Sequence, residues 1–159
     1  MLYENYEQVV ANVKKACERS GRNFQDITIV AVSKTKPLSD VEELLSHGVM
    51  EFGENKVQEM VDKYEHVSKP VHWHLIGHLQ TNKVKYIVDK ACLIHSVDSV
   101  HLAKEIEKEA AKKGVVAKVL LEVNIAQEET KFGLSCDEVL PLIQEIKDFP
   151  HIRVKGLMT

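Results

Sequence analysis

The apolar positions along the chain alternate between a helical spacing and an extended one. Residues 2–20 place apolar side chains three or four apart from Leu2 to Cys17, which predicts an amphipathic helix that ends at Gly21. The next segment, ITIVAVS at 27–33, is apolar on both sides and rich in β-branched residues. That pattern is typical of a buried parallel strand.

Short apolar runs and amphipathic segments continue to alternate along the rest of the chain. Five further strands are predicted, at residues 49–52, 71–76, 92–96, 117–125 and 152–157. Five further helices are predicted, at residues 40–47, 55–66, 81–88, 99–113 and 136–147. Ser39 and Glu42 have the spacing of a capping box for the first of these helices.

Six strands that alternate with helices predict a parallel α/β fold, in one domain that spans residues 1–159. Periodicity alone leaves both an open doubly wound sheet and a closed barrel possible. No GxGxxG follows the first strand, which argues against a dinucleotide fold. The chain also has no GxxxxGK[ST], which excludes a P-loop.

Composition and charge narrow the class of protein further. The 159 residues are 44% hydrophobic and 28% charged, with a formal net charge of -3, so we expect no nucleic-acid or membrane surface. No apolar run approaches the roughly 18 residues of a membrane span, and the first residues lack a signal-peptide pattern, so we expect a cytoplasmic protein. Three cysteines without a CxxC pair argue against disulfides and a thiolate zinc site.

Polar residues gather at the carboxyl ends of the predicted strands, the edge where parallel α/β folds build their ligand sites. These residues are Lys34, Glu54, Asn55, His74, Gly77, Ser96, Asp98, Asn124, Met158 and Thr159. A lysine at the end of an apolar strand can lose part of its hydration, which lowers its pKa and frees the amine to attack a carbonyl. The alternative for Lys34 is a side chain that simply reaches solvent, and Lys36 is a rival amine.

The segment VHWHLIGH at 71–78 offers a metal site as a competing interpretation. His72 and His74 share one strand face, and His78 could complete a three-histidine zinc site. Gly77 turns the chain before His78, and no carboxylate lies close in sequence, so we expect no metal here. Asn55, between a strand and a helix, could cap that helix or present its amide to a ligand.

Six segments in order resemble the pyridoxal phosphate homeostasis protein family. They are AVSKTKP (31–37), FGENKVQE (52–59), WHLIGHLQTNK (73–83), HSVDS (95–99), VNIAQEETKFGL (123–134) and KGLMT (155–159). The resemblance implies a TIM-type barrel like the N-terminal domain of alanine racemase, preceded by an extra helix. It also implies that Lys34, and not Lys36, holds pyridoxal 5'-phosphate as a Schiff base.

By the same resemblance, Asn55, His74, Asn124 and Met158 belong to the cofactor site. The implied role is intracellular cofactor homeostasis and the balance of amino-acid and keto-acid pools, with cofactor-dependent apo-enzymes as conceivable partners. The alternatives are a racemase-like enzyme and a fragment with little cofactor binding. A racemase needs positioned bases on both ring faces, and only Lys34 qualifies here, which favours the carrier.

The six predicted strands compare with the eight of a complete barrel. We therefore expect an incomplete barrel that lacks its C-terminal βα units. In the family, the segments that hold the cofactor phosphate follow the last residue of this chain. On that basis we expect weaker cofactor binding than in a version extended by two βα units.

Overall fold

The computed structural model describes residues 1–159 and contains one six-stranded parallel sheet with helices packed against it. The strands are β1 (Ala31–Val32), β2 (Glu51–Glu54), β3 (His72–Leu75), β4 (Ala91–Val97), β5 (Ala117–Glu122) and β6 (Ile152–Met158). The helices are α1 (Leu2–Ser20), α2 (Leu38–Ser46), α3 (Val57–His66), α4 (Val84–Ile87), α5 (Val100–Lys113) and α6 (Val139–Ile146). Single 3₁₀ turns occur at Phe24–Asp26, Thr81–Lys83 and Cys136–Glu138.

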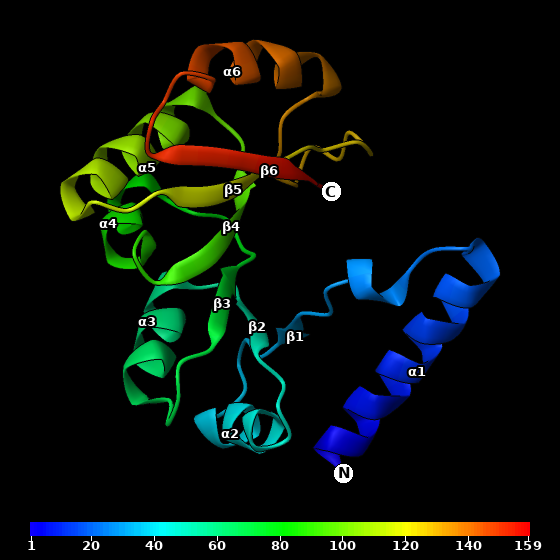
Figure 1. Ribbon diagram of the computed structural model, residues 1–159. Helices are drawn as coiled ribbons and strands as arrows, with labels where there is room; N and C mark the ends of the chain where they lie inside the picture. The colour runs from blue at the N-terminus through cyan, green and yellow to red at the C-terminus, as the bar shows by residue number, and fades with distance from the viewer.

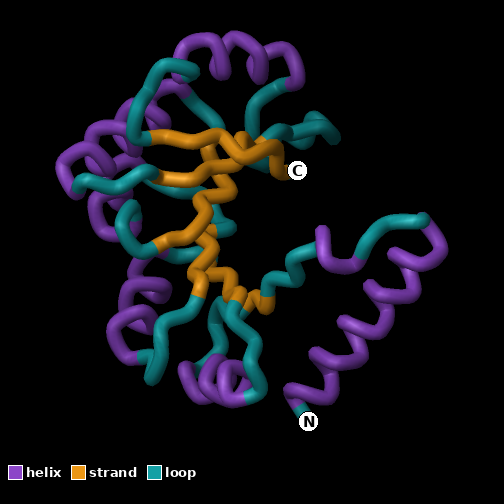
Figure 2. Tube along the Cα trace, in the orientation of Figure 1, coloured by secondary structure: helices purple, strands orange, loops and turns teal.

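Each strand pairs with its neighbour in sequence, in the order β1 to β6, and every pair is parallel. The sheet curves, and α2 to α6 wrap its outer side (Figure 1). Helix α1 stands apart across the concave side and contacts α2 (Figure 2). This arrangement confirms the predicted fold, an incomplete TIM-type barrel with an extra N-terminal helix. None of the helices combines the length and apolar character that a membrane crossing requires.

The hydrophobic core fills the layer between the sheet and its outer helices. Phe52 and Trp73 face this layer from paired positions on β2 and β3, with ring centroids 5.9 Å apart. Met60 of α3 and Ile106 of α5 pack in the same cluster and are fully buried. In each central strand, the residues that face the helices therefore pack in the core, and the alternate residues face the concave side of the sheet.

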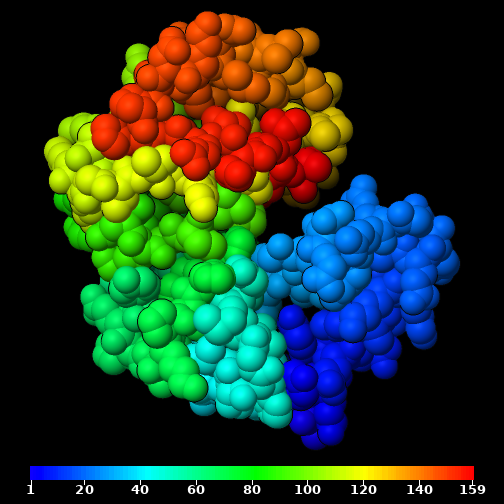
Figure 3. Space-filling model, viewed as in Figure 1, coloured from blue at the N-terminus to red at the C-terminus, as the bar shows by residue number.

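The register of the sheet places residues of neighbouring strands side by side on the same face. Val32 pairs with Gly53, and Gly53 pairs with His74, so these three positions share the concave face. Val32 is 49% exposed there, whereas Phe52, one residue before Gly53, is completely buried on the opposite face. Figure 3 shows the open hollow between the N-terminal helix and the body of the protein.

Two sequence predictions need correction. The strand predicted at 27–33 shrinks to Ala31–Val32, because only these two residues find ladder partners on β2. The capping box of Ser39 and Glu42 is wrong: α2 begins at Leu38, after Pro37. The Glu42 carboxylate instead accepts hydrogen bonds from the backbone N–H and the hydroxyl of Ser68, at 2.6 and 2.5 Å.

The two faces of the sheet predict very different losses of stability when a side chain is replaced by alanine. Phe52→Ala should lower the free energy of unfolding by about 3–5 kcal/mol, because it empties a fully buried site. Val32→Ala, its control on the concave face, should change that free energy by roughly 0.5 kcal/mol or less. Urea denaturation followed by circular dichroism measures both. Equal losses would show that the sheet faces are assigned wrongly.

Candidate functional site

Lys34 lies in a tight turn directly after β1. The Lys36 N–H closes this turn by donating to the Ser33 carbonyl at 3.0 Å. Ser33 is buried, whereas Lys34 is exposed. The turn therefore presents a free amine at the carboxyl end of the sheet, where parallel α/β folds place their ligands.

The residue after Lys34 adopts a backbone conformation that is rare for its type. Thr35 has φ of 63°, in the left-handed region that β-branched residues avoid. Its N–H donates to the Glu59 carboxylate of α3 at 2.6 Å. Because such strain persists only where the surroundings hold it, this hydrogen bond helps to fix the turn that carries Lys34.

The buried ammonium group of Lys63 stabilises the turn that carries Lys34. Lys63 of α3 donates to the Glu54 carboxylate at 2.6 Å, to the Ser33 carbonyl at 2.7 Å and to the Glu59 carboxylate at 2.9 Å. The Ser33 hydroxyl adds a 2.5 Å hydrogen bond to the same Glu54 oxygen. The Lys63 and Glu54 side chains are 5% and 0% exposed, so this pair is shielded from solvent. Both neighbours of Lys34 are thus tied to one network on α3.

Lys36 occupies a different environment from Lys34. It lines a small cavity, of about 160 Å³, together with Val41 and Leu44 of α2 and the buried Phe52. Those residues belong to the outer, helix-covered side of the sheet. The structure therefore separates two lysines that the sequence places only two residues apart.

Asn55 follows β2 at the same edge of the sheet. Helix α3 begins at Val57 and its N-cap is Lys56, so capping by Asn55 is wrong. A Cβ atom on Gly77 would lie 2.5 Å from the Asn55 carbonyl oxygen, so only glycine allows this close approach. Gly77 thereby lets the loop after β3 support the backbone of Asn55, whose amide is not used as a helix cap.

His74 lies at the centre of a polar cluster on the concave face. Its Nε2 is 2.6 Å from the Glu51 carboxylate, and its Nδ1 is 2.8 Å from the Nε2 of His95. His72 Nδ1 contacts the other Glu51 oxygen at 2.7 Å. Both nitrogens of the buried His74 ring are therefore engaged by neighbouring side chains.

The polar cluster perturbs two further groups. Burial, with the nearby charge of His74, lowers the pKa of His95 to about 4. Burial and the negative charge of Glu51 raise the pKa of the Cys92 thiol to about 11. His78 lies outside this cluster and stacks on Phe132, with ring centroids 3.7 Å apart, so the three-histidine set is not assembled.

The remaining two candidates lie at the ends of β5 and β6. The Asn124 side chain donates to the Glu128 carbonyl at 2.7 Å and accepts from the Glu128 N–H at 3.2 Å. It therefore organises its own loop. Met158 ends β6, pairs with Glu122 and is partly exposed. These two residues share the strand edge with Lys34 but belong to the other end of the sheet.

Sequence reasoning grouped some residues that the structure separates, and it missed others. Glu54 is completely buried and binds Lys63 of α3 on the helix side of the sheet, and Ser96 is also completely buried. The missed residues are Lys63 and Glu59, which support the Lys34 turn, and Glu51, which contacts His74. The spacing of Glu59 and Lys63, four apart on one helix, was the available signal.

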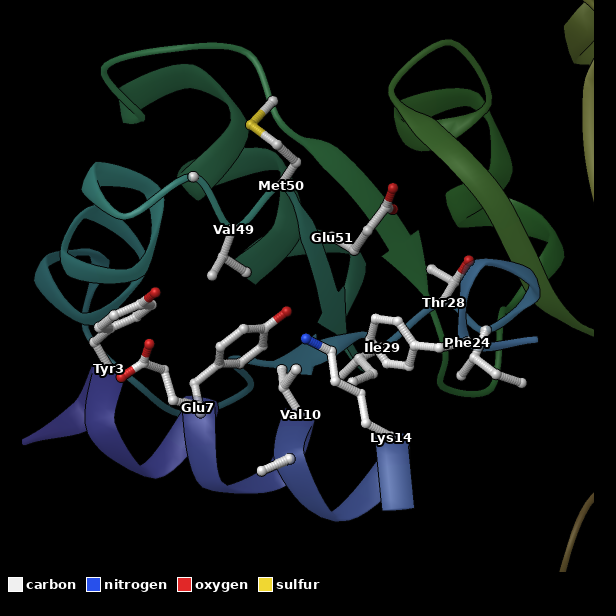
Figure 4. A pocket seen from close by; sticks show the side chains of 14 residues that line it. Tyr3, Glu7, Val10, Lys14, Phe24, Thr28, Ile29, Val49, Met50 and Glu51 are labelled. Carbon is white, nitrogen blue, oxygen red and sulfur yellow. The ribbon is translucent and has the colours of Figure 1, made fainter. Parts of the chain in front are cut away.

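A larger cavity lies away from Lys34, between α1 and the start of β2. It encloses about 660 Å³. Lys14 and Val10 of α1 line it from one side, and Val49 and Glu51 line it from the other (Figure 4). Lys34 does not line this cavity, so its volume does not mark the candidate cofactor site.

Comparison with known proteins relates this geometry to a family. The family model for the alanine racemase N-terminal domain matches residues 5–159. A pyridoxal phosphate homeostasis protein of Aquifex aeolicus is 43% identical over 157 residues, which cover 98% of this chain and 69% of that protein. A structure of an unknown protein from Bifidobacterium adolescentis is 30% identical, with a TM-score of 0.92 over 99% of this chain and 68% of that one.

One solved relative contains the cofactor that the sequence suggests. PipY of Synechococcus elongatus, with pyridoxal phosphate bound, is 30% identical and has a TM-score of 0.79. The match covers 94% of this chain and 69% of that chain. The likeness therefore extends to nearly the whole of the sheet and helices described above.

The Lys63 network predicts a strong effect on stability. Lys63→Met should lower the free energy of unfolding by about 3–5 kcal/mol, because it leaves the Glu54 carboxylate buried without its cation. The double variant Glu54→Gln with Lys63→Met should recover much of that loss, since no buried charge remains. Urea denaturation measures both, with the exposed Lys104→Met as control. A double variant no more stable than Lys63→Met would contradict this account.

Glu59 predicts a dependence of stability on pH. Burial alone would raise the pKa of Glu59, but hydrogen bonds from Lys63 and the Thr35 N–H lower it below its usual value. The unfolded chain then binds the proton more readily, so the stabilisation is present above the ordinary carboxyl pKa and is lost as pH falls. Compared with Glu59→Gln, the wild type should keep its advantage in unfolding free energy from neutral pH down to about pH 5 and lose it progressively from there to about pH 3. A constant difference over that range would disprove the linkage.

Proposed function

Because the chain belongs to the pyridoxal phosphate homeostasis protein family, we propose that it binds pyridoxal 5'-phosphate as a Schiff base on Lys34. Its role is to hold the cofactor and to help balance the amino-acid and keto-acid pools that depend on it. Relatives with that name, and the cofactor-bound PipY structure, support this proposal.

One observation carries the choice of Lys34: it is an exposed amine whose two neighbours are both fixed by a buried network. Ser33 and Thr35 bind Lys63 and Glu59, respectively, while the Lys34 side chain stays free. A covalent ligand on a flexible turn would lose conformational entropy on binding. Fixing the turn beforehand removes part of that cost, and the network achieves this without using the amine.

The other site residues fit the cofactor in distinct ways. The Asn55 amide, which does not cap α3, can donate to or accept from a polar ring substituent. His74 lies on the concave face of the sheet, where its largely buried ring can contact the cofactor ring. Met158 adds a polarisable apolar contact at the end of β6, and Asn124 orders the loop beside it.

The covalent step needs only an amine and an aldehyde. The lysine nitrogen attacks the aldehyde carbon, a C=N bond forms, and the carbonyl oxygen leaves as water. The bound cofactor supplies an electron sink for amino-acid chemistry. A racemase would need a second base opposite Lys34, and the four tyrosines of this chain lie on α1, α3 and α4 instead. This placement supports a carrier without its own catalysis.

We further propose that the carrier acts in the cytoplasm and passes its cofactor to apo-enzymes. The three cysteines, Cys17, Cys92 and Cys136, are all free, as is typical of proteins from reducing compartments. An exposed Lys34 also leaves the covalent bond accessible to a second amine, which is how a recipient enzyme would take the cofactor.

Chemical trapping tests the assignment of Lys34. Pyridoxal phosphate followed by borohydride should attach a pyridoxyl group irreversibly, and peptide mapping should place it on Lys34. Lys36→Ala is the matched control, because Lys36 faces the α2 side. It should keep the label, whereas Lys34→Ala should lose it.

Two outcomes of the trapping experiment would contradict the proposed Schiff base on Lys34. Label on Lys36, retained in Lys34→Ala, would move the covalent site. Failure of the wild type to form any adduct at a cofactor excess would refute cofactor binding by this chain. Circular dichroism of each variant confirms that the fold is intact.

A further inference from the structure

A mixed set of metal-binding side chains lies on the concave face, brought together from three neighbouring strands. Glu51 begins β2, His74 lies within β3, and Cys92 is the second residue of β4. One ligand atom of each lies within 4.8 Å of the other two. We propose that Glu51, His74 and Cys92 bind a divalent cation of the zinc class, independently of the cofactor.

The types of ligand atom select the metal. A carboxylate oxygen, an imidazole nitrogen and a thiolate sulfur are the three ligands that Zn²⁺ uses in proteins, at about 2.0–2.3 Å. Mg²⁺ and Ca²⁺ prefer oxygen alone. Around a tetrahedral ion these bond lengths place ligand atoms about 3.3–3.8 Å apart. A metal ion would replace the 2.6 Å contact between His74 Nε2 and the Glu51 carboxylate, so these two ligand atoms must move apart by roughly an ångström.

Residues around the three ligands already support the geometry that a metal requires. If the metal takes Nε2 of His74, the ring proton must sit on Nδ1, and the Nε2 of His95 lies 2.8 Å away to accept it. His72 contacts the second oxygen of Glu51 at 2.7 Å and orients that carboxylate. Two ligands thus have an outer partner, as is usual in built metal sites.

Charge and access also favour a cation at this position. Glu51 and a deprotonated Cys92 would together contribute two negative charges, which match a divalent ion. The Glu51 side chain is 30% exposed, so an ion can reach its carboxylate from solvent. The fourth coordination position is left for water.

The metal site and the cofactor site are separable. Glu51 and Cys92 lie at the amino-terminal ends of their strands, whereas Lys34 follows the carboxyl end of β1. His74 is the one residue assigned to both. The sequence argued against a metal because it offered only His72, His74 and His78, and the two decisive ligands come from neighbouring strands.

Cobalt binding to the full chain, without added cofactor, tests the proposal. After treatment with a chelator, the protein is titrated with Co²⁺ and its absorbance is followed. We expect one ion per chain and a thiolate-to-cobalt charge-transfer band, which equimolar Zn²⁺ should remove. Cys92→Ser should abolish the band and weaken binding by at least about tenfold. Cys136→Ser and Cys17→Ser, which change cysteines outside the cluster, should leave it intact.

Two further variants separate this site from the cofactor and from a misfolding effect. Lys34→Ala should bind Co²⁺ as the wild type does, so a failure of the cofactor proposal would leave the metal result unchanged. His95→Asn should weaken Co²⁺ binding roughly 10–100-fold while keeping the charge-transfer band, because it removes the partner of His74 and no ligand. A band that survives in folded Cys92→Ser, or no stoichiometric binding by the wild type, would overturn the assignment.

Discussion

The buried ammonium of Lys63 is the interaction on which the candidate cofactor site depends. A charge in the interior is tolerated only when it is paired and hydrogen-bonded, and this one has three oxygen partners from Ser33, Glu54 and Glu59. Those partners belong to the turn after β1, the end of β2 and helix α3. The need to satisfy one cation therefore fixes the relative position of three elements at the strand edge.

The same requirement explains how the turn after β1 is held in place while the Lys34 amine makes none of these contacts. The first lysine after β1 stays exposed, while the lysine on α3 takes the buried role. Thr35 then adopts its unfavourable backbone angle between them, held by the oxygen that also accepts from Lys63. The buried Lys63 thus fixes the backbone of the turn, and Lys34 leaves an exposed amine in the same turn.

Much of the fold could be predicted from the sequence, because the periods of apolar residues report directly on helices and strands. The six parallel strands and the position of Lys34 follow from such local signals. The partners of His74 could not be predicted in the same way. Glu51 reaches it from β2 through regular strand pairing, whereas Cys92 reaches it from β4 across a register shift between Trp73 and His74, and no local pattern encodes these partners. The cavity that Lys36 lines with residues of α2, and that Lys34 does not line, is likewise a tertiary result.

The oxygen shared by Thr35 and Lys63 has a consequence for the motions of the protein. An exposed turn normally opens by local fluctuations, and its amides exchange with solvent quickly. Here, separating the Thr35 N–H from Glu59 also disturbs a carboxylate that pairs with a buried cation. Opening of this surface turn therefore also disturbs the Glu59–Lys63 pair. The amide hydrogen of Thr35 should exchange with solvent as slowly as the amides of the core.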